Sequence, residues 1–217
     1  MPVLQGKDYK VNTFSEMPVL RAMLMIMTGR THDLAAFTAL GIVVLNMTPG
    51  PLTVSTVIVA LFANQIGGIV PDIDQPTAPF WRSLPAGNIF SRLFARAAGG
   101  HRFITHSVIG VVGIGYLAVL LLNFLDPILG SVDPSVVWWS FMIGYFSHLF
   151  MDMFTREGVP LLLPIPVKFG LPPFKRLRMT TGKAIETWVV FPTLILVNIA
   201  LYSMNHTEVI ALVKSII

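Results

Sequence analysis

Cysteine is absent from this sequence of 217 residues. Its absence excludes disulfide bonds, thiolate-ligated zinc sites and cysteine nucleophiles. A metal site in this chain must therefore use histidine, carboxylate or backbone oxygen ligands. Charge is also scarce, because Asp, Glu, Lys and Arg together make up 12% of the residues, whereas a soluble domain carries about a quarter. The sequence contains too few charged side chains to cover a soluble fold of this size.

Apolar residues, by contrast, make up 54% of the chain. This surplus of apolar surface predicts contact with lipid. Five apolar segments carry most of it, and the last four approach the ~20 residues that a helix needs to cross a bilayer. The segments are 34–48, 52–70, 107–125, 136–154 and 185–204. We expect an all-α fold, a polytopic membrane helix bundle with about five membrane segments, in which the first two form a hairpin.

The positive charges predict how the bundle is oriented. All but one of the 15 Lys and Arg residues precede the first segment or lie in the loops that follow the second and fourth. Cytoplasmic loops of membrane proteins carry an excess of such residues. We therefore expect an inner-membrane protein with its N-terminus and long loops in the cytoplasm and its C-terminus outside. Topology explains the net charge of +4, and no nucleic-acid recognition module is visible, so we expect no nucleic-acid partner.

The chain divides into three parts on this basis. Residues 1–27 are expected to form an N-terminal cytoplasmic arm, either disordered or upstream of the true start. Residues 28–206 form the bundle, with two long cytoplasmic loops at 71–106 and 155–184, and residues 207–217 form a short tail.

Both long loops are expected to be ordered. Residues 80–98 mix aromatic and basic side chains, which is typical of a helix that lies on the membrane surface. Residues 159–173 contain five prolines, which exclude a continuous helix and predict a partly inserted loop near the site.

Histidines and carboxylates gather at the cytoplasmic ends of the predicted helices. Carboxylates are costly inside a membrane and usually face a partner or a cavity there. His148 and Asp152 share one helix face because they are four residues apart. Imidazole and carboxylate groups together suit zinc, manganese or iron. The polar residues at these ends are His32, Asp33, Asp72, Asp74, His101, Arg102, Thr105, His106, Ser107, Ser147, His148, Asp152, Thr180, Thr181 and Glu186.

A structural role explains several of these residues when each is taken alone. Ser107 or Thr105 is a suitable N-cap for the helix that follows, and Ser147 is able to hydrogen-bond its own helix backbone. Asp72 and Asp74 are suited to end a helix, although the two carboxylates repel each other unless a cation lies between them. The convergence of all these groups at one depth favours a functional site instead.

Four motifs in order resemble the bacterial and archaeal family of membrane-bound metal-dependent hydrolases, the inner-membrane group that includes a LexA-regulated member. The resemblance covers roughly residues 32–186 and implies a metal-dependent hydrolase. The arm before Met27 departs from the family pattern, which usually begins close to the first histidine. The motifs are His32, Pro71-Asp72-Ile73-Asp74, His101-Arg102-Phe103-Ile104-Thr105-His106-Ser107 and Gly144-Tyr145-Phe146-Ser147-His148-Leu149-Phe150-Met151-Asp152.

We hypothesise that one or two divalent ions (zinc, manganese or iron) activate water at the cytoplasmic membrane surface. Asp74 bridges a second ion or acts as general base, and His101 orients a ligand or protonates the leaving group. Arg102 suits a phosphate or another anionic group. The expected metal ligands are His32, Asp72, His106, His148 and Asp152.

The expected partners are membrane lipid and a lipid-like or phosphorylated small-molecule substrate, and a phosphoester is the first choice. Amide and carboxyl ester substrates stay open.

Two other functions compete with hydrolysis. One is a metal-stabilised scaffold or regulator without turnover. The other is a small transporter, which requires polar groups through the whole membrane depth, whereas the outer halves of these segments are almost all apolar.

Overall fold

The computed structural model describes residues 18–47, 52–76, 78, 81, 85, 87–97, 102, 104–165, 167–180 and 184–216, with backbone alone for 18–28, 88, 94–97 and 215–216. Within these ranges the chain is helical and has no strand, apart from two isolated bridges between single residues. The all-α prediction is confirmed. The elements are α1 (Pro18–Asn46), α2 (Val54–Ile69), η2 (Val70–Asp74), α4 (Gly87–Ala97), α5 (Val108–Leu129), α6 (Pro134–Met153), η3 (Lys175–Leu177), η4 (Glu186–Val190), α7 (Phe191–Met204) and α8 (His206–Ile216).

Three of the described helices are long and apolar enough to cross a membrane, namely Val54–Asp74, Val108–Leu129 and Glu186–Met204. They cover all but the first one or two residues of the second, third and fifth predicted segments. The first and fourth predicted segments lie in α1 and α6, whose apolar runs are interrupted by polar residues.

α1 begins at Pro18, so the last residues of the predicted arm are helical, and residues 1–17 lie outside the described part of the chain. Residues 19–27 are mostly strong helix formers such as Leu, Met, Ala and Arg, which explains this extension.

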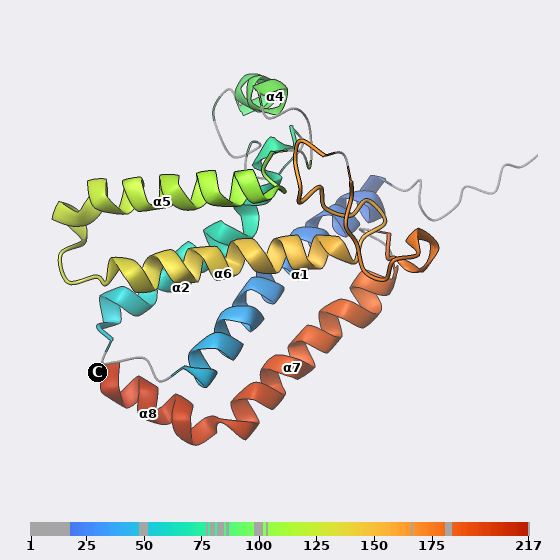
Figure 1. The fold of residues 1–217 in the computed structure, drawn as a ribbon. Helices are drawn as coiled ribbons and strands as arrows, with labels where there is room; N and C mark the ends of the chain where they lie inside the picture. The colour runs from blue at the N-terminus through green and yellow to red at the C-terminus, as the bar shows by residue number, and fades with distance from the viewer. Residues whose placement is uncertain are drawn as a thin grey trace, which may run out of the picture.

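α6 is the central helix, and α2, α1 and α5 all pack against it, while α7 packs against α1 (Figure 1). The approach of α2 to α6 depends on two glycines. A Cβ added to Gly144 would lie 2.0 Å from the carbonyl oxygen of Asn64, and one added to Gly67 would lie 2.0 Å from that of Phe141. The backbones of α2 and α6 are therefore in direct contact here, as small residues allow between membrane helices. The Asn64 side chain also donates to the Ser140 carbonyl (3.0 Å).

Local capping explains where α5 and α6 begin. Ser107 caps α5, because its hydroxyl accepts from the Gly110 N–H (3.1 Å). Asp133 caps α6 in the same way through the N–H groups of Ser135 and Val136. The structural roles expected for Ser107 and Ser147 are confirmed, since the Ser147 hydroxyl donates to a carbonyl of its own helix (2.8 Å).

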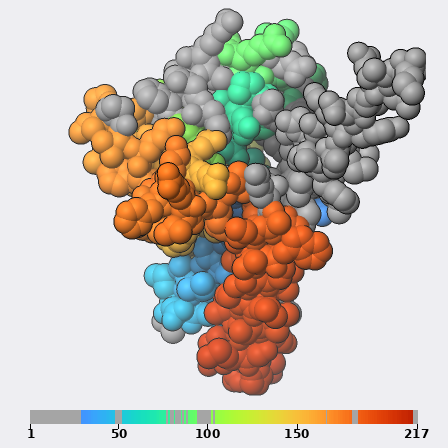
Figure 2. All heavy atoms as spheres, turned by 90° about the vertical axis from the view of Figure 1, so that its right-hand side faces the viewer, coloured from blue at the N-terminus to red at the C-terminus, as the bar shows by residue number. Residues whose placement is uncertain are grey.

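The loop that follows α6 is ordered without being a helix, as its prolines predict. Val159 and Phe169 exchange both backbone hydrogen bonds (2.8 Å each), and the Leu171 N–H donates to the Met153 carbonyl (2.7 Å). The Arg178 side chain donates to the carbonyls of two prolines in the loop. The loop therefore folds back over the end of α6 and lies beside the start of α7 (Figure 2).

Four segments far apart in the sequence come together in the same region as this loop. They are the middle of α1, η2 at the end of α2, the turn before α5 and the last turns of α6 (Figure 1). α4 lies within residues 80–98, for which a surface helix is expected, and α8 shows that the short tail is helical.

Candidate metal centre

His148 lies on α6 with its two ring nitrogens in different surroundings. Nδ1 is 2.7 Å from the carbonyl oxygen of Gly68 on α2. A carbonyl only accepts, so Nδ1 carries the proton. Nε2 is buried and has no hydrogen-bond partner within the described residues, although it lies 3.5 Å from Asp72 Oδ1 and 3.6 Å from Asp152 Oδ2. A histidine held by an N–H···O=C bond with its other nitrogen directed at carboxylates is arranged as a metal ligand.

His106, in the turn before α5, has the same arrangement through a different chain of hydrogen bonds. The Thr105 hydroxyl donates its one proton to Asp74 Oδ2 (2.6 Å) and therefore accepts from His106 Nδ1 (2.9 Å). His106 Nε2 then lies 3.1 Å from Asp152 Oδ2. Burial lowers the pKa of His106, which favours the neutral ring. In the neutral ring Nε2 carries a lone pair that faces a carboxylate oxygen, and the two repel each other. A cation bound between them would remove the repulsion.

Asp152 is the carboxylate that the other groups surround. Its side chain is buried on α6, one turn after His148. His32 on α1 approaches it from another side, with Nε2 3.9 Å from Oδ1, and the His32 ring stacks on that of His148 at 4.2 Å. His32 Nδ1 is also buried without a hydrogen-bond partner among the described residues.

The structure brings all five predicted metal ligands together. Two overlapping sets have ligand atoms that lie within 4.8 Å of one another, and both sets contain His148. Each set is able to hold a metal ion through imidazole nitrogen and carboxylate oxygen. The first set is His32, His148 and Asp152, and the second is Asp72, His106 and His148.

Asp72 is the most exposed of the five candidate ligands. The Asp72 side chain is 34% exposed, whereas those of Asp152 and His106 are 1% and 0% exposed. A molecule from the membrane surface would therefore meet Asp72 first.

Arg102 holds Asp152 in place. Its Nη2 donates to Asp152 Oδ1 (2.7 Å) and its Nη1 to the Thr155 hydroxyl (2.8 Å), and the residue is only 7% exposed. Its φ of 56° lies in the left-handed region, which is uncommon for a residue with a side chain. The guanidinium thus bonds to a candidate ligand carboxylate, a contact that the sequence did not predict, and its expected contact with a phosphate or another anionic group stays a prediction.

Asp74 lies beside the cluster but belongs to neither set. Its Oδ2 accepts from the Arg102 N–H (2.9 Å) as well as from Thr105, so it fixes the turn that carries both Arg102 and His106. The Tyr145 hydroxyl on α6 supports the same turn through the Thr105 carbonyl. His101 lies outside the described residues.

Asp74→Ala is expected to lower the melting temperature of the purified protein clearly, while Asp74→Asn is not. Alanine leaves the buried donors of Arg102 and Thr105 without an acceptor, at about 1–3 kcal/mol each, whereas the asparagine oxygen still accepts. Thermal unfolding in detergent, followed by circular dichroism, measures the difference. Equal melting temperatures for the two variants would contradict the role of Asp74 in holding the turn.

Sequence reasoning did not identify three of these supporting contacts. Tyr145 belongs to the last motif and Thr155 lies three residues after that motif ends, but their spacing does not show which partner each one binds. Gly68 takes part through its backbone carbonyl, and side-chain identity carries no signal for that.

Comparison with known proteins places this chain in a family. The family model described as YdjM inner membrane protein matches residues 27–210. The inner membrane proteins YdjM of Escherichia coli (strain K12) and Shigella flexneri are each 36% identical over 104 residues, 48% of this chain and 48% of theirs. The alignment thus spans about half the length of these relatives. The uncharacterised protein YvsG of Bacillus subtilis (strain 168) is 26% identical over 165 residues, 76% of this chain and 88% of its own.

No solved structure matches this chain. The names of the family and its members give a location and no reaction, so the hydrolase implied by the motifs stays a proposal. The family match covers most of the chain, and three helices have the length and composition of membrane spans. The chain belongs to the YdjM inner membrane protein family and is a helical protein of the inner membrane.

Proposed function

We propose that this protein is a metal-dependent hydrolase, embedded in the membrane, that cleaves a lipid-like phosphoester at the cytoplasmic surface. The observation that carries the proposal is the pair of histidines whose Nδ1 atoms are used as donors. This leaves the Nε2 atoms of His148 and His106 directed at Asp152 inside a buried cluster.

The ligand set favours zinc, manganese or iron over magnesium or calcium. Three imidazoles and two carboxylates contribute nitrogen and oxygen, whereas magnesium and calcium prefer oxygen alone. A bound ion would lower the pKa of a water molecule to near neutrality and polarise a phosphoryl oxygen.

The chain's own residues orient the site. The Gly68 carbonyl fixes the His148 ring, and Thr105 fixes that of His106. Arg102 sets the orientation of Asp152 and offsets its charge. Asp72, at the open side, is the carboxylate placed to meet substrate and to accept a proton from an attacking water. In this proposal Asp74 is a positioning residue, because its contacts are with the turn at 102–105.

One observation favours a second function, that of a metal-stabilised scaffold. An ion in the first set would join α1 to α6, and an ion in the second set would join η2, the turn before α5, and α6, so the two sets together connect four segments of the bundle. His106, His148 and Asp152 are also almost fully buried. In a scaffold, metal removal lowers the melting temperature and no substrate is turned over.

Hydrolysis of phosphatidic acid in mixed detergent micelles, followed by phosphate release, separates the two functions. We expect the metal-loaded protein to release phosphate, a chelator to abolish the activity, and Asp72→Asn to lower it about 100-fold while the protein stays folded. Asp33→Asn is the matched control, because Asp33 lies beside His32 but in neither ligand set. A chelator-dependent fall in melting temperature, without phosphate release from this lipid or from soluble phosphoesters, would favour the scaffold.

A further inference from the structure

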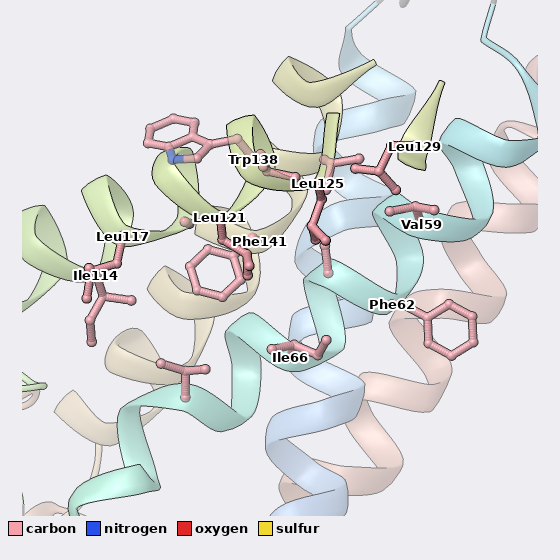
Figure 3. A pocket seen from close by; sticks show the side chains of 15 residues that line it. Val59, Phe62, Ile66, Ile114, Leu117, Leu121, Leu125, Leu129, Trp138 and Phe141 are labelled. Carbon is pink, nitrogen blue, oxygen red and sulfur yellow. The ribbon is translucent and has the colours of Figure 1, made fainter. Parts of the chain in front are cut away.

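An apolar groove runs along the bundle between α2 and α5, with α6 as its floor. Its volume is about 370 Å³, which lies in the range of small-molecule pockets, about 300–1,000 Å³. Figure 3 shows the walls: Ile66 comes from α2, Leu117 and Leu121 from α5, and the Phe141 ring of α6 lies between them. α2 and α5 each pack on α6, which leaves the space between them open.

The lining of the groove is almost wholly hydrocarbon. The one polar atom of its aromatic side chains, Trp138 Nε1, donates to the Gly115 carbonyl (2.9 Å) and is therefore not offered to a ligand. Both walls belong to helices with the length and composition of membrane spans, so hydrocarbon and not water is the medium around them. An occupant of this groove must be apolar along its whole length.

One end of the groove adjoins the metal cluster. Val70 and Ile114 line that end and pack against the buried cluster of Tyr145, Leu149 and Val159, whose first two members flank His148 on α6. Val70 is also the first residue of η2, two residues before the partly exposed Asp72. A molecule whose apolar part lies in the groove therefore has its other end at the open side of the cluster.

The length of the groove fits one hydrocarbon chain. From Val59 to Val70 it follows about 16 Å of α2, and from Ile114 to Leu129 about 22 Å of α5. The hydrocarbon core of a bilayer is about 30 Å thick. The groove thus begins near the cluster and follows α5 to its last residue, Leu129, over a length comparable with that of one extended acyl chain.

We propose that the groove between α2 and α5 binds one acyl chain of the lipid substrate and so places its phosphate group at Asp72 and the metal cluster. This inference rests on the proposed function and adds to it the place where one tail of the lipid phosphate is held. The specificity of the enzyme is then for the hydrocarbon chain as well as for the phosphoester.

Photo-crosslinking in lipid nanodiscs tests the groove directly. The probe is phosphatidic acid with a diazirine in one acyl chain, diluted into phosphatidylethanolamine, and the labelled residues are mapped by mass spectrometry. We expect labelling to concentrate on the groove walls. Ala118→Trp fills the groove from α5 and Ile66→Trp from α2, and each is expected to reduce this labelling at least about fivefold.

Leu120→Trp is the matched control, since Leu120 is an exposed residue of α5 outside the groove. It should leave labelling unchanged, and equal metal content in all three variants shows that the cluster is intact. Even labelling of all membrane-facing helices, insensitive to both blocking variants, would mean ordinary boundary lipid and overturn the proposal.

The test also separates the groove from the proposed function. If the protein hydrolysed short-chain phosphatidic acid but its groove walls were not labelled, the hydrolase proposal would hold and the groove proposal would be wrong. If the groove walls were labelled but the protein contained no metal and hydrolysed no substrate, the proposed enzymatic function would be wrong. The role of the groove in placing a substrate would then be wrong as well.

Discussion

Purified protein with His148→Asn is expected to contain about a tenth or less of the metal bound by the unchanged chain. His148 belongs to both candidate ligand sets, so its loss affects either mode of binding. Asparagine removes Nε2 but offers an N–H donor near the position of Nδ1, so the contact with the Gly68 carbonyl is retained. The expected loss is therefore a loss of ligation and not of folding. Elemental mass spectrometry of the detergent-purified protein measures it.

His206→Ala is the control for this experiment, because His206 is an exposed residue at the start of α8. It should keep its full metal content, and circular dichroism and gel filtration should show that both variants are folded. The double variant His106→Ala/His148→Ala extends the test to the nitrogen of His106. Absence of metal from the unchanged chain, even after reloading with zinc, manganese or iron, would mean that a proton and not a metal ion lies between these histidines and Asp152.

The ligand cluster was predictable because each member lies at or near the end of a predicted apolar segment, and the charge pattern predicts that these ends lie on one side of the membrane. His148 and Asp152 also share a helix face by spacing alone, and the structure keeps them 3.6 Å apart. What the sequence could not show is which ring nitrogen is available. That depends on the Gly68 carbonyl, which approaches His148 from a helix about 80 residues earlier in the chain.

Arg102 and Asp74 show a second limit of sequence reasoning. A cation and a carboxylate near a metal site suit substrate binding and base catalysis equally well. In the fold both support the ligands, because Arg102 bonds to Asp152 and Asp74 accepts from the turn that carries Arg102 and Thr105. Such partners depend on the path of the turn and on its left-handed residue at position 102, which no periodic pattern encodes.

The sequence predicts which segments are helical better than it predicts the residues at which each helix begins and ends. The apolar segment 34–48 marks a membrane run, but the helix that carries it begins at Pro18, because the preceding residues form helices readily in spite of their polar neighbours. Apolar composition predicts which residues contact lipid, whereas helix propensity predicts the residue at which the helix begins. The two differ wherever a helix extends beyond the membrane.

The cluster and the bundle share one critical contact, the approach of α2 to α6. Gly144 lies one turn before His148 and against the backbone at Asn64, and Gly68 supplies the carbonyl that fixes the His148 ring. The spacing between these helices therefore sets both the packing of the core and the position of a metal ligand.

Gly144→Ala is accordingly expected to lower the melting temperature by about 10 °C, which corresponds to about 3 kcal/mol in a chain of this size. The added methyl group would lie 2.0 Å from the Asn64 carbonyl oxygen and 3.0 Å from the Gly68 nitrogen. Both are backbone atoms, so the helices must move apart. Thermal unfolding in detergent measures the loss, and metal content should fall with it because the Gly68 carbonyl then moves away from His148.

Gly113→Ala is the matched control, since a Cβ at Gly113 would have no atom within 4 Å. Alanine favours helix over glycine by about 1 kcal/mol, so this variant should melt at the same temperature as the unchanged chain or slightly higher. If Gly144→Ala melted like Gly113→Ala and kept its metal, α2 and α6 would not be in backbone contact. The Gly68 carbonyl would then not be what directs His148 Nε2 into the cluster.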